Sequence, residues 1–167
     1  MKKPKKLPQE IVDLLLPRLK DEFTAYYHYR ALSNYCQGVG YVKAAKFFQG
    51  ESDNELAHAK KIENYLVDWN VNPQLPKIDE PKIEFKGLLE GIEMSYSIEY
   101  ALYEDYEDTS MKIFKEGDVC TFDFLQFFRT EQTAAVAEYS DMLNMLEGTD
   151  TASKFELLML EEKLFGE

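Results

Sequence analysis

The stretch VNPQLPKIDEPKIE, residues 71–84, decides the topology of this 167-residue chain. It carries prolines at positions 73, 76 and 81. Proline disfavours helical backbone at the residue before it, so the stretch is predicted to be a long extended connection. The segments that flank it on either side determine what it connects.

Both flanks show apolar residues at helical spacing, and strand signals are nearly absent. Glycines at Gly38, Gly40 and Gly117 interrupt the pattern, and Asp118 is a good N-cap for the segment after it. A second stop-and-cap signal lies at residues 148–151. The predicted helices cover about residues 8–37, 42–70, 85–114, 119–146 and 150–164.

Two helical hairpins joined by a long connection predict an all-α four-helix bundle with one crossover and a short fifth helix. We expect a single domain over residues 1–167, with the bundle at about 8–147. The start of the first helix stays open. A start at Pro8 places Pro17 inside the helix, where it should kink it, whereas a start near Pro17 places that proline in the tolerant first turn.

Composition narrows the class of protein. The net charge of −12 argues against general nucleic-acid binding and suits a protein that attracts cations, although solubility alone would explain it equally well. Four lysines among the first six residues are expected to be a solvated tail rather than a nucleic-acid arm. No apolar run reaches membrane-spanning length, there is no secretory signal, and two cysteines make no disulfide framework, so a cytoplasmic location is expected.

Glu55 and His58 are the first candidates for chemistry. Residues three apart on a helix share a face, so this pair can reach one metal ion. Many such pairs in acidic chains are solvated surface residues. Geometry strengthens the metal interpretation because residues equidistant from a hairpin turn lie level with each other.

Two such level pairs exist. Glu22 and Glu55 are centred on the Gly38–Gly40 turn, and Glu99 and Gln132 are centred just before Gly117. Each pair is separated by 33 positions, so each level lies roughly 25 Å from its turn. The four positions can therefore form one layer across two stacked hairpins.

The neighbours of these residues predict that the layer is buried. Buried carboxylates are costly unless they are paired or bind metal, and a pair of divalent cations would remove the repulsion. Oxygen ligands with little imidazole suit iron or manganese. The apolar stripes carry Leu15, Leu19, Tyr26 and Tyr29; Ile92, Ser95, Leu102 and Tyr106; and Leu125, Phe128, Ala135 and Tyr139.

Three stretches resemble the non-haem ferritins: EFTAYYHY at 22–29, ESDNELAHA at 51–59, and TFDFLQFFRTEQ at 121–132. The resemblance covers nearly the whole chain, and the tail from Asp150 resembles the short helix that lines a fourfold axis in 24-subunit cages. It implies iron storage, with a bacterial-type chain and an animal-type second iron site.

The resemblance also implies roles for individual residues. Glu22, Glu55 and His58 would hold a first iron ion, and Glu55 would bridge to a second. Glu99 would bind that second ion and Gln132 would lie beside it. Tyr29 would hydrogen-bond a ligand and supply an electron.

Departures from the family pattern limit these expectations. Ala135 replaces a second carboxylate of many bacterial ferritins, and Asn54 and Ala134 stand where acids of a third, outer site would be, leaving only Glu131. We therefore expect two iron ions per subunit and doubt a third. Leu56 replaces the methionine that holds haem in bacterioferritins, so no haem is expected.

Other residues receive weaker predictions. His28 is expected at the surface or an interface rather than at the metal. Glu51 is either a residue beside the site or on an entry route, or a solvated one. Cys36 is expected to be a small buried apolar group, and no chemistry is assigned to Cys120.

The function implied by the resemblance is oxidation of Fe(II) by O2 or H2O2, with the product stored as mineral inside a self-assembled cage of 24 subunits. Two alternatives stay open from the sequence. One is a di-iron oxidase that acts on an organic substrate, and the other is a metal-free helical interaction module.

Overall fold

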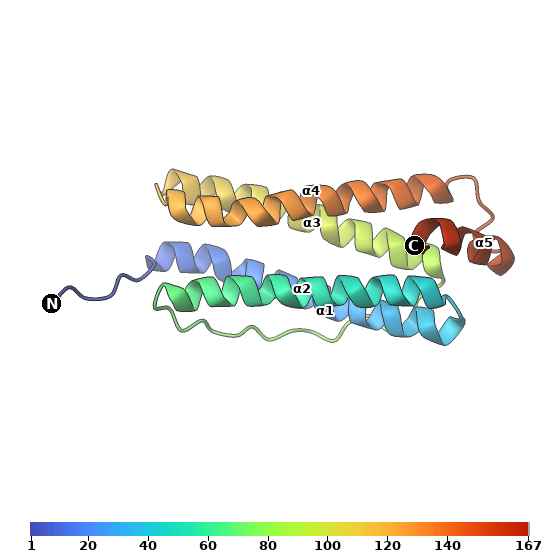
Figure 1. Cartoon of the computed structure of the whole chain (residues 1–167), viewed down its shortest axis with the longest axis horizontal. Coiled ribbons are helices and arrows are strands. Elements are labelled where there is room, and N and C mark those ends of the chain that lie inside the picture. Colours follow the sequence, from blue (N-terminus) through green and yellow to red (C-terminus); the bar gives the residue numbers. More distant parts are fainter. Residues whose placement is uncertain (167) are drawn as a thin grey trace.

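The computed structural model describes residues 1–166, and this part of the chain contains five helices and no strand. Four long helices form an elongated bundle and the fifth lies across one end (Figure 1). The fold class predicted from the sequence is confirmed. The helices are α1 (Gln9–Val39), α2 (Val42–Asp68), α3 (Leu88–Lys115), α4 (Val119–Leu146) and α5 (Lys154–Phe165).

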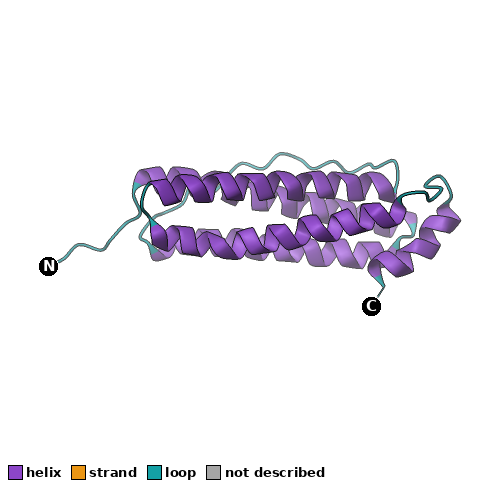
Figure 2. Cartoon of the chain, turned by 90° about the horizontal axis from the view of Figure 1, so that it is seen from above, coloured by secondary structure: helices purple, strands orange, loops and turns teal. Residues whose placement is uncertain are grey.

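The proline-rich stretch connects the two hairpins as predicted. It has no helix or strand and runs the length of the bundle beside α1 and α2, from the end of α2 to the start of α3 (Figure 1). The view turned by 90° shows it on the outside of the bundle (Figure 2). The crossover allows α3 to begin at the end of the bundle where α1 ends.

Helix α1 begins at Gln9, with Pro8 as its N-cap, so Pro17 lies inside it. Pro17 has no N–H to donate to the carbonyl one turn earlier, and the helix continues past this missing bond. The earlier of the two predicted starts is therefore the one observed. Leu15 and Leu19, on either side of Pro17, are fully buried, and their packing supports the helix there.

The largest differences from the predicted boundaries are at the starts of two helices. Helix α3 begins at Leu88 rather than near 85. Helix α5 begins at Lys154, where the Ser153 side chain accepts a hydrogen bond from the amide of Glu156. The predicted cap of α4 is confirmed, since the Asp118 side chain accepts from the Thr121 amide.

The seam between α1 and α3 is polar although it is buried. Four side-chain hydrogen bonds cross it, all between buried residues. Buried polar groups require partners, so each of these bonds restricts the relative position of the two helices. The pairs are Arg18–Thr109, Glu22–Tyr106, His28–Ser95 and Tyr29–Glu99.

Helix α5 is fastened to the turn between α1 and α2. The buried Glu161 carboxylate accepts from the amides of Lys43 (2.7 Å) and Ala44 (2.9 Å), in the first turn of α2. Helix α2 has no side-chain cap of its own. Lys154 donates to the Val39 carbonyl at the end of α1. Both charges match the helix ends they contact.

Within residues 1–166, no helix has both the length and the apolar character of a membrane span.

Candidate metal site

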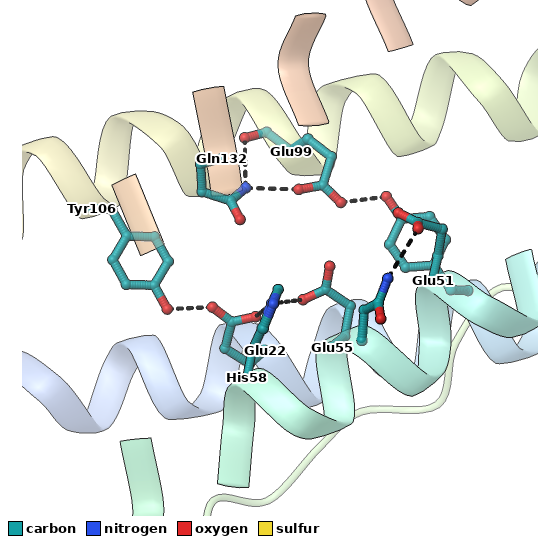
Figure 3. Close-up of polar contacts among 9 residues, drawn as sticks. Glu22, Glu51, Glu55, His58, Glu99, Tyr106 and Gln132 are labelled. Carbon is teal, nitrogen blue, oxygen red and sulfur yellow. Dashed lines mark hydrogen bonds and ion pairs between the residues drawn. The ribbon is translucent and has the colours of Figure 1, made fainter. Parts of the chain in front are cut away.

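Five of the predicted site residues meet between the helices at one level of the bundle (Figure 3). Glu22 comes from α1, Glu55 and His58 from α2, Glu99 from α3 and Gln132 from α4. The carboxylates are almost completely buried, with exposed fractions of 0% for Glu22, 3% for Glu55 and 1% for Glu99. The equal arms of the two hairpins place these positions in one layer, as the sequence spacing predicts.

Glu22, Glu55 and His58 form the tightest part of the cluster. Each offers one ligand atom, and these atoms lie within 4.8 Å of one another. The Nδ1 atom of His58 is 3.2 Å from Glu55 Oε2 and 3.5 Å from Glu22 Oε2. Glu22 Oε2 is buried and accepts no hydrogen bond within the described chain. One carboxylate oxygen is therefore turned into the cluster without a satisfying donor.

Glu99 faces this group from α3, with its carboxylate directed toward Glu55 (Figure 3). Gln132 Nε2 donates to Glu99 Oε2 at 2.7 Å, and the Tyr29 hydroxyl donates to Glu99 Oε1. Each oxygen of Glu99 thus has a donor that fixes its orientation. Tyr29 contacts a carboxylate of the cluster, and its aromatic ring is completely buried.

Burial and mutual repulsion control the charges. Burial is the main cause that raises the pKa of Glu55 far above its ordinary value, and burial also raises the pKa of Glu99. Burial acts in the same direction on Glu22, but close polar contacts with His58 and Glu55 outweigh it and lower the pKa of Glu22. Burial alone would lower the pKa of His58; hydrogen bonds and charges from Glu22 and Glu55 raise it to about 10.

These pKa shifts indicate that the site holds more negative charge than its basic side chains offset. His58 is the only basic side chain among the five residues. Three buried carboxylates with one imidazole form an oxygen-rich donor set, which suits Fe(II), Mn(II) or similar ions better than a thiolate-preferring ion. The residues fit a divalent cation held at Glu22, Glu55 and His58.

Tyr106 is a part of the site to which the sequence assigned no role. It was predicted only as an apolar neighbour of Glu99, two helical turns away on α3. The structure places it across from α1, where its hydroxyl donates to Glu22 Oε1 (Figure 3). A tyrosine on the same stripe as a predicted ligand was the available signal, but stripe position alone does not reveal a hydrogen-bond partner.

His28 was expected at the surface or an interface, which is wrong. It is 5% exposed, with Nε2 3.0 Å from Ser95 Oγ, and burial lowers its pKa to about 4.

Glu51 is half-buried beside the cluster and accepts from Asn54; burial and the charges of Glu138 and Glu99 raise its pKa to about 7. It is therefore not a freely solvated acid.

The two cysteines also have contrasting places. Cys36 is buried as predicted, and burial raises the pKa of its thiol to about 12. Cys120 is exposed near the start of α4.

Comparison with known proteins settles the family. A model described as the ferritin-like domain matches residues 12–149, which include every residue of the cluster. The chain belongs to the ferritin-like family. Residues 1–11, which include the first three residues of α1, and the residues after 149, which include α5, lie outside the match.

Relatives of this ferritin-like chain are similar over most of its length. A bacterial non-heme ferritin from Staphylococcus aureus (strain MRSA252) is 28% identical over 160 residues, covering 96% of this chain and 95% of that protein. A probable bacterial non-heme ferritin-like protein from Haemophilus influenzae is 29% identical over 140 residues, covering 84% and 85%. These matches support the resemblance found in the sequence.

Solved structures show the same fold. A humanized archaeal ferritin has a TM-score of 0.88 at 23% identity, covering 95% of this chain and 97% of that one. An open pore ferritin from Archaeoglobus fulgidus has a TM-score of 0.87 at 24% identity, covering 95% and 96%. The five-helix arrangement, including α5, is thus shared with ferritins.

Proposed function

We propose that this protein oxidises Fe(II) to Fe(III) at a dinuclear site inside each subunit and stores the product as mineral. The observation that carries the proposal is the convergence of ligand atoms from Glu22, Glu55 and His58 within 4.8 Å, deep inside the bundle. Membership of the ferritin-like family supports the same function. Iron is the substrate and cargo here.

Each side chain has a defined part in the proposed reaction. Glu22 and His58 hold the first Fe(II), Glu55 lies between the two ions, and Glu99 holds the second beside Gln132. Tyr29, hydrogen-bonded to Glu99, is the proposed catalytic residue, and it holds this ligand in place while both electrons of the step come from the two Fe(II) ions. Holding two ions close together allows O2 to take one electron from each, with two protons, and leave as H2O2. With H2O2 as oxidant, two electrons from iron and two protons produce two water molecules.

Storage requires an enclosed space that one bundle does not provide. We propose that subunits assemble into a closed symmetric cage, with 24 copies as in the cages that the sequence resembles. A humanized archaeal ferritin and an open pore ferritin from Archaeoglobus fulgidus have a similar fold. We propose that the protein is cytoplasmic and that it binds no haem.

The test removes the central carboxylate. Glu55→Ala should abolish the fast rise in absorbance that follows addition of Fe(II) under air in a stopped-flow instrument, while assembly stays intact by size-exclusion chromatography. Glu107→Ala, which alters an exposed acid of α3, is the matched control and should oxidise iron as the wild type does. Wild-type rates in Glu55→Ala would overturn the assignment.

Electron microscopy after iron loading tests storage separately. Electron-dense cores inside hollow particles are expected. A small particle that oxidises iron without accumulating it would instead support an oxidase of organic substrates, and a small particle that binds no metal would support an interaction module.

A further inference from the structure

The second buried tyrosine of the cluster, Tyr106, has a contact that defines the shape of the site. Its hydroxyl donates to Glu22 Oε1, while Glu22 Oε2 has no hydrogen bond and faces His58 at 3.5 Å. The two oxygens of the Glu22 carboxylate therefore have different surroundings. Oε1 is hydrogen-bonded to a residue of α3, and Oε2 faces the interior of the cluster.

Tyr106 itself is held on every side. Its side chain is completely buried, and its ring stacks on Phe128 with centroids 5.0 Å apart. The Arg18 guanidinium lies 5.9 Å from the ring centroid. Arg18 is in turn held by Thr109 Oγ1 at 3.1 Å and by Asp21 Oδ2 at 2.7 Å. These contacts leave the hydroxyl little freedom to move.

The same contacts connect two helices at the level of the site. Arg18 lies one turn before Glu22 on α1, and Thr109 lies one turn after Tyr106 on α3. The Arg18–Thr109 and Tyr106–Glu22 bonds therefore join α1 to α3 twice within one turn of each helix. The position of Glu22 relative to α3 is consequently fixed before any cation binds.

We propose that Tyr106 is a positioning residue that restricts Glu22 to one metal-binding oxygen, Oε2, and so sets the coordination of the ion held with Glu55 and His58. This inference rests on the proposed function of the same site. A carboxylate held through one oxygen binds through the other, whereas a free carboxylate can rotate or bind through both. Residues that hydrogen-bond a ligand typically change metal affinity or activity about 10–100-fold when removed.

A tyrosine control is available elsewhere in the core of the bundle. Tyr139 is also fully buried, but its hydroxyl has no hydrogen-bond partner within residues 1–166. Replacing either tyrosine with phenylalanine removes one buried hydroxyl and keeps the ring. The pair therefore separates loss of the Glu22 bond from loss of a hydroxyl in general.

The experiment titrates the assembled protein with Co(II), without oxidant, and follows the visible ligand-field bands. We expect Tyr106→Phe to weaken Co(II) binding about 10–100-fold and to shift the bands. Tyr139→Phe should keep the wild-type spectrum and stay within about twofold in affinity. Circular dichroism and size-exclusion chromatography check the fold and assembly of both variants.

The outcomes separate the two proposals. If Co(II) binds the wild type but the two tyrosine variants match each other and the wild type, positioning by Tyr106 is wrong while the metal site stands. A loss of stability in Tyr106→Phe with an unchanged spectrum would also overturn it, because it would show a purely structural role. If Co(II) binding is insensitive to Glu55→Ala, the proposed function itself fails.

Discussion

Replacing Glu55 with glutamine should separate the destabilising effect of this buried charge on the fold from its contribution to metal binding. Glu55 is 3% exposed, and burial raises its pKa far above the ordinary value, which shows how poorly its negative charge is tolerated. Glutamine has nearly the same shape and carries no charge. We therefore predict that Glu55→Gln is as stable as the wild type without metal, or more stable, while it binds metal more weakly.

The magnitude follows from binding equilibria. A ligand at 100 times its Kd stabilises the folded state by about 2.7 kcal/mol. For a chain of this size that amounts to a rise in Tm of about 5–11 °C. If loss of the bridging carboxylate weakens binding about tenfold, the same metal concentration gives only about 1.4 kcal/mol. The metal-induced rise in Tm should then be about half that of the wild type.

Thermal unfolding followed by circular dichroism, without oxidant and with Co(II) or without it, measures both effects. Glu63→Gln, which alters a half-buried acid two turns further along α2, is the control and should keep the full rise. The reasoning is refuted if Glu55→Gln shows the wild-type rise in Tm. It is also refuted if the metal-free variant is clearly less stable than the wild type.

Three further predictions concern the rest of the fold. Burial lowers the pKa of His28 to about 4, so its contribution to stability is full above pH 6.5 and is lost as pH falls, by about 2 kcal/mol at pH 5. Urea unfolding at pH 7 and pH 5 should show a smaller loss in His28→Gln; an equal loss would contradict this. Glu161→Ala removes the carboxylate that caps α2 and should lower the free energy of unfolding by about 0.5–2 kcal/mol. Hydrogen exchange of the amides in the first turn of α2 should become faster. Wild-type protection of these amides would refute the role of α5 as a cap. Gly91→Ala places a Cβ 2.6 Å from Leu32 Cδ1 and should lower the free energy of unfolding by about 1–3 kcal/mol. Gly50→Ala meets no atom within 4 Å and should raise the free energy of unfolding by about 1 kcal/mol. Chemical denaturation that gives both changes the same sign would contradict the packing.

The helices and the crossover were predictable because their signals are local. Prolines, glycine breaks and apolar spacing each act within a few residues, so they indicate elements without knowledge of the whole fold. The start of α1 was left open because Pro17 fits either of two rules. Packing of Leu15 and Leu19 around it decides the matter, and such packing exists only in the folded chain.

The cluster was predictable to the extent that it follows from symmetry of the hairpins. Equal spacing about two turns places Glu22, Glu55, Glu99 and Gln132 in one layer, and the structure brings them together there. Their roles as ligands stay a prediction. The partners that orient them were harder to find, because Tyr106 is 84 positions from Glu22 and reaches it only through helix packing.

Burial of polar groups was the least predictable property. His28 has a polar side chain off the face of Glu22, which favours the surface, yet Ser95 on α3 provides a buried partner. Glu161 is similar, since its buried place depends on amides 117 and 118 positions away. A polar residue is buried where a distant partner satisfies it, and sequence spacing along one helix does not show that partner.

Anomalous X-ray diffraction at the iron edge, from crystals soaked in Fe(II) without oxidant, tests the central claim most directly. The account predicts two peaks inside each bundle, one among Glu22, Glu55 and His58 and the other between Glu55 and Glu99. Crystals with no anomalous density among these side chains would contradict it.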